Sequence, residues 1–245
     1  MALSRTEELF TRIYADNAWG GSESRSGPGS GITRTQALRS ELERLVQDLL
    51  VRSILDLPCG DFHWMNMVDF PATQYIGADI VAPLIAANNQ RYARPGRQFV
   101  RLDLLRDPLP KADVILCRDA LVHLSFSDIA QALHSMKHSG SAYFLVTTFL
   151  AHTRNRDIPT GAWRPLNLSL APFCFPEPLR MLCDARPDGT YPDKVLALYR
   201  FADLPSHVCN LGSIRRFYAA IDRGTYRMQR FYHGARRRAS GAVKS

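Results

Sequence analysis

Hydrophobic and polar positions along the chain follow the spacings of helices and of short buried strands. Apolar residues recur every three or four positions along residues 35–50, which predicts an amphipathic helix. Helical patterns return at 82–94 and at 127–137, where Ser125 or Ser127 can cap the helix. Apolar runs that predict buried strands occupy residues 53–57, 74–79, 98–103, 112–117 and 142–148.

This order of short strands and helices predicts an α/β protein with a doubly wound parallel sheet. Ligands of such sheets bind at the carboxyl ends of the strands. The predicted strand ends are polar and carry Asp56, Asp79, Asp103, Arg118 and Asp119. One acid at a strand end is usually a helix cap or a solvated residue, but acids at three successive strand ends favour a ligand site.

The turn after the first predicted strand, Asp56 to Phe62, is neither a G-x-G-x-x-G loop nor a Walker loop. An acid here is awkward beside a phosphate but suits a cationic ligand. Gly60 allows a ligand to approach the backbone closely. Asp79 follows at the distance where a ribose diol is commonly held. A ligand with a ribose, an adenine and positive charge but no phosphate is S-adenosylmethionine.

Four segments resemble the motifs of class I S-adenosylmethionine-dependent methyltransferases. They are SILDLPCGDFHWM, YIGADI, VRLDLLRDPLP and DVILCRDALVHLSFSDI, all within residues 53–150. The flanks FTRIYADNAWGGSESRSGPGS and GAWRPLNLSLAPFCFP look like a bacterial small-molecule or glycan subgroup. Pro58 and Phe62 replace the outer glycines of the usual first motif. The resemblance implies a seven-stranded Rossmann-like sheet, with residues 181–184 and 194–201 as a terminal antiparallel hairpin.

The resemblance also implies which residues bind the cofactor. The first turn, with Asp56, Pro58, Cys59, Gly60 and Asp61, would line its methionine end. Asp79 would accept the ribose hydroxyls, and Ile80 would pack on the adenine. Asp103 would receive the adenine amino group beside Leu104. Further contacts are expected from Arg118, Asp119, Trp64 and Trp19, although Trp64 is as readily explained as a core residue.

His123 is the candidate catalytic base for an acceptor whose hydroxyl proton must be removed. It follows the fourth predicted strand, where the resembling enzymes place residues that face the methyl group. Asp119 lies four positions earlier and can orient His123 if the segment is helical. A structural histidine is a nearly equal alternative, and His63 and His152 are weaker candidates for the base.

Two segments outside the predicted core are candidates for covering the site and binding substrate. The Gly/Ser-rich loop 20–31 is predicted to be mobile and to form a lid with Tyr14 and Trp19, although a leader that never touches the site is an alternative. The segment 151–177 is long for a loop, which predicts either a substrate-binding insertion or a packed surface loop. Its candidate substrate ligands, together with Tyr14, are Asn155, Trp163, Arg164 and Asn167.

We expect one structural domain with four parts. These are a lid loop and helix (1–50), a cofactor-binding core (51–150), a substrate-binding insertion with the hairpin (151–205), and a basic helix and tail (206–245). The formal charge of +8 resides in the last part, because residues 1–210 carry equal numbers of bases and acids. A helix is predicted at 213–232, and Arg236, Arg237 and Arg238 follow it. A solvated basic face is the default interpretation of such a run.

Composition narrows the class of protein further. The five cysteines are odd in number and have no C-x-x-C spacing, so neither a disulfide framework nor a metal site is expected. The N-terminal residues lack the apolar core of a signal peptide, and no apolar run is long enough for a membrane span. We therefore expect a soluble, cytoplasmic protein.

The favoured hypothesis is a methyltransferase for a small polar acceptor, such as a hydroxyl of a sugar, a glycan or a secondary-metabolite intermediate. An RNA methyltransferase that uses the basic tail is an alternative. Against it, the fourth strand is followed by Cys117-Arg118-Asp119-Ala120 instead of the Asn/Asp-Pro-Pro-Tyr/Phe motif of enzymes that methylate base amino groups. A non-catalytic protein that binds S-adenosylmethionine is the third possibility.

Overall fold

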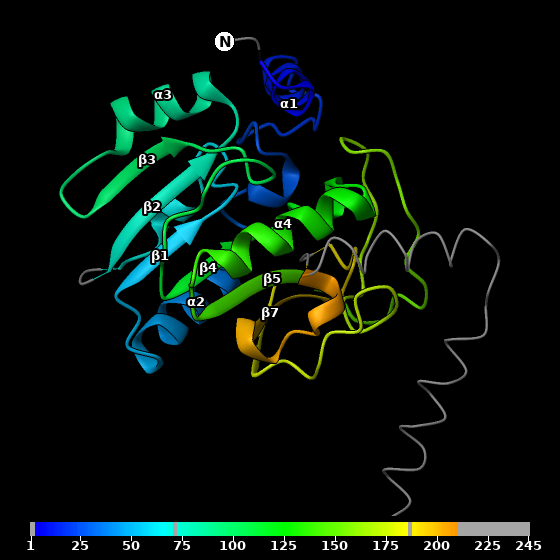
Figure 1. Ribbon diagram of the computed structural model, residues 1–245. Coiled ribbons are helices and arrows are strands. Elements are labelled where there is room, and N and C mark those ends of the chain that lie inside the picture. Colours follow the sequence, from blue (N-terminus) through cyan, green and yellow to red (C-terminus); the bar gives the residue numbers. More distant parts are fainter. Residues whose placement is uncertain (1–2, 71–72, 186–187, 210–245) are drawn as a thin grey trace, which may run out of the picture.

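The structure is a computed structural model that describes residues 3–70, 73–185 and 188–209 (Figure 1). Its seven strands form one sheet in the order β3-β2-β1-β4-β5-β7-β6. The strands are β1 (Ser53–Asp56), β2 (Gln74–Asp79), β3 (Arg97–Arg101), β4 (Val114–Cys117), β5 (Tyr143–Phe149), β6 (Arg180–Cys183) and β7 (Lys194–Arg200).

The first five strands are parallel, and β7 runs antiparallel to both β5 and β6. The predicted doubly wound sheet and its terminal antiparallel pair are therefore confirmed. Chain order reverses between β1 and β4, which are neighbours in the sheet. A parallel sheet opens a crevice at such a point, at the carboxyl ends of its strands.

Helices cover both faces of the sheet. Successive strand residues point to opposite sides, so the apolar strands present an apolar surface on each face that must be covered. On one face Leu55, Ile115 and Phe144 pack in a cluster that includes Ile129 and Leu133 of α4 (Phe126–His138). On the other face the neighbouring strand residues pack with α2 (Gln36–Asp48) and α3 (Ala82–Tyr92). Each face thus has its own apolar layer. The helices that cover the sheet can be followed in Figure 1.

The helix α1 (Arg5–Ala15) was not predicted. Its start has a capping-box sequence, because Ser4 is followed three residues later by Glu7, and the Ser4 side chain accepts a hydrogen bond from the Glu7 amide. This local signal could have revealed the helix.

Ser125 caps α4, as one of the two predicted alternatives. Short 3₁₀ turns occupy Pro28–Ser30, Met65–Met67, Leu121–His123, Phe201–Asp203 and Ser206–Cys209.

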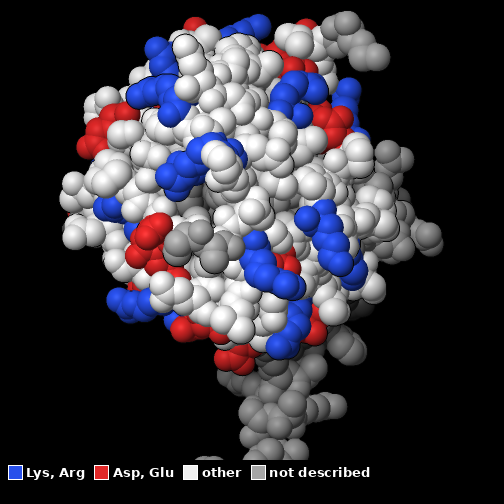
Figure 2. All heavy atoms as spheres, turned by 90° about the vertical axis from the view of Figure 1, so that its left-hand side faces the viewer, with Lys and Arg blue, Asp and Glu red and all other residues white. Residues whose placement is uncertain are grey.

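The predicted basic helix 213–232 and the arginines at 236–238 lie outside the described residues. Figure 2 shows the face that lies on the left in Figure 1, and its basic and acidic side chains are interspersed. This mixture agrees with the neutral charge balance of residues 1–210. Among the described residues, no helix combines the length and apolar character needed to cross a bilayer.

Candidate functional site

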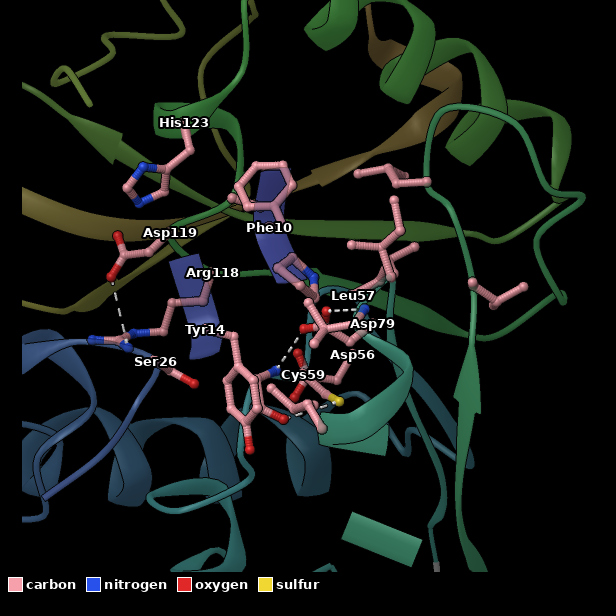
Figure 3. A pocket seen from close by; sticks show the side chains of 18 of the residues that line it. Phe10, Tyr14, Ser26, Asp56, Leu57, Cys59, Asp79, Arg118, Asp119 and His123 are labelled. Atoms are coloured by element: carbon pink, nitrogen blue, oxygen red, sulfur yellow. Dashed lines mark hydrogen bonds and ion pairs between the residues drawn. The ribbon is translucent and has the colours of Figure 1, made fainter. Parts of the chain in front are cut away.

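A cavity opens at the carboxyl ends of β1, β2 and β4, where the reversal of chain order predicts a ligand site (Figure 3). Residues of α1 and of the Gly/Ser loop line its other side. Most of the predicted site residues come together here. Those that line the cavity are Tyr14, Trp19, Asp56, Pro58, Cys59, Gly60, Trp64, Asp79, Ile80, Asp103, Leu104, Arg118, Asp119 and His123.

The first turn brings its backbone close to the cavity at Gly60. Gly60 has a φ of 56°, and a Cβ at this position would lie 2.2 Å from Oγ of Ser26. The side-chain amide of Asn88 donates to the Gly60 carbonyl at 2.8 Å. The turn therefore requires a residue without a side chain, held in place from α3.

Asp79 lies at the end of β2 with its carboxylate oriented by two backbone amides. The amides of Gly60 and Val81 donate to it at 3.2 and 3.0 Å. Burial raises the pKa of Asp79 to about 6, although these hydrogen bonds oppose the rise. The carboxylate is thus held rigidly in a cavity wall, where it can accept hydrogen bonds from a ligand.

Asp56 ends β1 and is 3% exposed. The Tyr75 hydroxyl donates a hydrogen bond to its carboxylate. Burial raises the pKa of Asp56 to about 7; Tyr75 and the charge of Arg118 act in the opposite direction. A cation bound beside Asp56 would favour its charged form.

Asp103 follows β3 by two residues, because the strand ends earlier than the sequence pattern suggests. Its carboxylate accepts hydrogen bonds from the Leu105 amide at 2.9 Å and from the Ser4 hydroxyl at 3.3 Å. The second contact joins the cavity wall to the residue that caps α1. Asp103 therefore helps to hold α1 at the cavity.

Four charged side chains at the ends of β4, β6 and β7 form a network beside the cavity, in which three of the four are buried. Arg118 pairs with Asp184 through Nε at 3.0 Å and Nη2 at 2.8 Å. Lys194 lies 2.8 Å from Asp184 and 2.7 Å from Asp119. The charges of Lys194 and Arg118 hold the pKa of Asp119 well below its usual range, against the effect of burial. Asp119 thus stays ionised where it lines the cavity (Figure 3).

His123 lies in the 3₁₀ turn Leu121–His123, so the helical spacing through which Asp119 was expected to orient it does not occur. Its Nδ1 lies 3.0 Å from the Ala162 carbonyl oxygen. Burial lowers the pKa of His123, while the Ala162 contact and Asp119 raise it. The Trp19 ring packs on the imidazole, with centroids 5.1 Å apart. The ring is therefore oriented by a backbone carbonyl and covered by an aromatic side chain.

Asp61 does not line the cavity, although it was predicted to contact the cofactor. It accepts hydrogen bonds from the Ser24 hydroxyl at 2.9 Å, the Arg25 amide at 2.8 Å and the Ser26 hydroxyl at 3.2 Å. Arg118 adds a hydrogen bond to the Gly29 carbonyl at 2.9 Å. The Gly/Ser loop, predicted to be mobile, thus follows a path fixed by contacts with the core.

The candidate substrate ligands of the 151–177 segment also lie outside the cavity lining. The Arg164 side chain donates to backbone carbonyls, and Asn155 and Asn167 hydrogen bond with the backbone of their own loop. Trp163 is 43% exposed and packs against Phe149. This segment is a hydrogen-bonded loop packed on β5 and on the His123 turn.

The two weaker candidates for the base are also absent from the lining. Nε2 of His63 lies 3.6 Å from Glu23 of the Gly/Ser loop. His152 belongs to the 151–177 loop, where its backbone carbonyl accepts a hydrogen bond from the Asn167 side chain. Of the three histidines considered, His123 is the one that lines the cavity.

Several residues of the site were missed in the sequence. Thr6 and Phe10 belong to the unpredicted α1, and Phe10 packs on Trp19 with centroids 6.4 Å apart. Their signal was the capping box at Ser4. Asp184 is 66 residues from Arg118, and Lys194 is 75 residues from Asp119. No local pattern marks such pairs.

No family model matches the chain, and no curated protein matches it. Solved structures do resemble it. One is the 1,6-didemethyltoxoflavin-N1-methyltransferase of Burkholderia thailandensis with bound 1,6-didemethyltoxoflavin and S-adenosylhomocysteine. It is 16% identical with a TM-score of 0.55, over 82% of this chain and 92% of that chain.

Human N-acetylserotonin methyltransferase in complex with SAM is another similar structure. It is 18% identical with a TM-score of 0.49, over 80% of this chain. The alignment spans 60% of that longer chain. S-adenosylmethionine-dependent methyltransferase SibL, in its apo form, is 16% identical with a TM-score of 0.48, over 67% of this chain and 54% of that chain.

The sheet topology and the likeness to the Burkholderia methyltransferase agree on the architecture. The chain has the fold of the class I S-adenosylmethionine-dependent methyltransferases, as its motifs implied.

Proposed function

We propose that this protein is an S-adenosylmethionine-dependent methyltransferase that acts on a small polar acceptor, such as a hydroxyl of a sugar, a glycan or a secondary-metabolite intermediate. The observation that carries the proposal is the meeting of Asp56, Asp79 and Asp103 in one cavity at the switch point of this fold. The similar Burkholderia enzyme is a methyltransferase with a small heterocycle bound, which supports a small acceptor.

The residues of the cavity fit this cofactor. Asp79 is an acceptor-only group when ionised, and two amides aim it, so it suits a pair of ribose hydroxyls. Gly60 allows Ser26 of the Gly/Ser loop to pack against the first turn, and the carboxylate of Asp56 complements a cationic ligand at the methionine end. Ile80 and Leu104 provide apolar surface for the adenine, with Asp103 as the partner for its amino group. When bound, the cofactor supplies a methyl group on a sulfonium sulfur.

The chain itself would position the acceptor, remove its proton and exclude water. His123 is the base in this proposal, with a lowered pKa that keeps the imidazole neutral near pH 7. Trp19 and Phe10 cover the cavity from the N-terminal side. Tyr14, in the last turn of α1, would contact the acceptor.

Calorimetry with S-adenosylhomocysteine tests the binding half of this proposal. We expect Asp79→Asn to weaken binding at least about tenfold, because a hydrogen bond to a charged group contributes about 1.5–3 kcal/mol. Asp203→Asn is the control, since Asp203 is exposed and its partner is Arg200 at 3.8 Å. Absence of binding to the unmodified protein would refute the proposed cofactor.

Transfer of a labelled methyl group from S-adenosylmethionine tests the catalytic half. The acceptors to compare are sugar nucleotides, glycan fragments, small phenols and RNA. We expect turnover with a small hydroxylated acceptor. Turnover with RNA alone would instead favour an RNA methyltransferase, and tight cofactor binding without any transfer would favour a binding protein.

A further inference from the structure

The loop of residues 156–164 holds the turn that carries His123 through hydrogen bonds on both sides of the histidine. The Gly161 amide donates to the His123 carbonyl at 2.8 Å, and the Arg164 amide donates to the Val122 carbonyl at 3.1 Å. The same loop supplies the Ala162 carbonyl for the His123 ring. The turn and the loop therefore form one hydrogen-bonded unit.

Arg164 is the centre of this unit and is only 7% exposed. Its Nη1 donates to the carbonyls of Leu121 and Val122, both at 3.0 Å, and its Nη2 donates to Leu124 at 2.7 Å. Its Nε donates to the Arg156 carbonyl at 2.9 Å, within the loop itself. One planar guanidinium thus gathers carbonyls before and after His123, which a lysine ammonium cannot do in the same geometry.

The contact with Ala162 determines the tautomer of His123. A carbonyl oxygen only accepts hydrogen bonds, so Nδ1 must carry the proton in the neutral ring. Nε2 then holds the free lone pair. This is the atom that must accept a proton if His123 is the base.

We propose that Arg164 is a positioning residue for His123: it fixes the 121–124 turn against the loop so that the Ala162 carbonyl holds Nδ1–H and Nε2 is presented to the acceptor. This inference rests on the proposed function, since it gives His123 the role of base. It also replaces the substrate-binding role that the sequence suggested for Arg164, because the guanidinium is engaged by backbone carbonyls.

The charges around His123 favour the neutral imidazole that this role needs. Burial and the nearby positive charge of Arg164 lower the pKa of His123, whereas Asp119 raises it. The effect of Asp119 is limited because its charge is shared with Lys194 and Arg118. Arg164 therefore acts on the base through both geometry and charge.

A double-mutant cycle separates positioning from a general structural role. We expect Arg164→Lys to lower kcat about 10- to 100-fold with unchanged affinity for S-adenosylhomocysteine. In a His123→Ala background the same substitution should have no further effect on kcat. Arg180→Lys, at an exposed arginine paired with Asp48, is the control. An equal loss of kcat in both backgrounds would overturn the inference.

The pH profile provides a second readout. We expect the rising limb of kcat/KM, which reports deprotonation of the base, to move to higher pH in Arg164→Gln because a charge that disfavours the imidazolium is lost. It should move less in Arg164→Lys, which keeps the charge. Identical profiles for the two variants and the unmodified enzyme would contradict an action on His123.

Nitrogen NMR of the histidine rings tests the inference without any acceptor, and the His123 signal is assigned by its loss in His123→Gln. We expect the Nδ1–H tautomer in the unmodified protein, and a change of tautomer or titration in Arg164→Lys. An Nε2–H tautomer in the unmodified protein would refute the arrangement even if the Arg164 variants failed to fold. Failure of the proposed function alone would appear differently, as a correct tautomer without methyl transfer.

Discussion

Asp56 and Asp79 are neighbouring carboxylates buried at the cavity, and burial raises the pKa of Asp56 to about 7 and that of Asp79 to about 6. Their solvation is replaced by a few hydrogen bonds, from the Tyr75 hydroxyl to Asp56 and from two amides to Asp79. Buried carboxylates such as these are unfavourable for stability by themselves. We infer that a ligand of complementary charge offsets this cost.

The raised pKa of Asp56 predicts how stability depends on pH. Between about pH 4 and pH 7 the folded state retains a proton that the unfolded state releases, so the free energy of unfolding falls as pH rises. Asp56→Asn keeps the acceptor for Tyr75 but cannot ionise. We expect the variant to match the unmodified protein near pH 4 and to be more stable at pH 8, by at most about 4 kcal/mol.

Urea unfolding at a series of pH values measures this effect. Asp203→Asn is the control, since the Asp203 side chain is half exposed. Equal stability of Asp56→Asn and the unmodified protein at every pH measured would contradict the prediction that Asp56 binds a proton on folding.

At the scale of elements, α1 is held to the core by few but specific contacts. Glu7, 3% exposed, accepts hydrogen bonds from Nε and Nη2 of Arg101, both at 2.9 Å. Ser4 reaches Asp103 in the cavity wall, and Leu9 lies over Gly161, where a Cβ would approach it to 2.7 Å. This helix therefore connects the cavity to the 156–164 loop, and we expect a ligand to leave the cavity when α1 moves.

We predict that the ion pair between Glu7 and Arg101 slows the release of the cofactor, because it holds α1 against the core. Glu7→Gln keeps the size of the side chain and removes its charge, so the bidentate ion pair is lost. We expect a destabilisation of about 1 kcal/mol, because Arg101 is partly exposed, and release of S-adenosylhomocysteine that is about fivefold faster.

Stopped-flow fluorescence of Trp19 and Trp64, which both line the cavity, can follow this release. Glu8→Gln provides a matched control on the same helix, since Glu8 is exposed. The same release rate for Glu7→Gln and Glu8→Gln would show that α1 does not limit ligand exit.

For the whole molecule, the network of Arg118, Asp119, Asp184 and Lys194 joins parts that are far apart in the sequence. It links β4 with the β6–β7 pair, and Arg118 extends it to the Gly/Ser loop at Gly29. Two bases and two acids balance one another in the buried network. Its integrity should therefore matter for the stability of the whole fold.

Removal of one acid from the network leaves two buried cations with a single partner acid. We expect Asp184→Asn to lower the free energy of unfolding by about 3–5 kcal/mol, as for other broken buried pairs. Asp188→Asn affects the exposed pair with Arg34 at 3.3 Å and should cost less than about 1 kcal/mol. Urea unfolding of both variants checks the difference, and similar small losses would contradict a structural role of the network.

The sequence by itself determined most elements of the central sheet and the polar edge of that sheet. Apolar runs predicted the five parallel strands, and helical spacing predicted α2, α3 and α4, because these signals lie within a few adjacent residues. The acids at the strand ends were likewise visible, and Asp56, Asp79 and Asp103 do meet in one cavity. The capping box at Ser4 is a further local signal, and it marks the start of α1.

Tertiary structure alone decided what the remaining polar side chains contact. Arg164 could bind a substrate as far as the sequence shows, but packing of its loop on the 121–124 turn directs it to carbonyls about 40 residues away. Asp61 turns to the Gly/Ser loop for the same reason. Polar side chains take the partners that folding brings within hydrogen-bond distance, and chain neighbours do not reveal those partners.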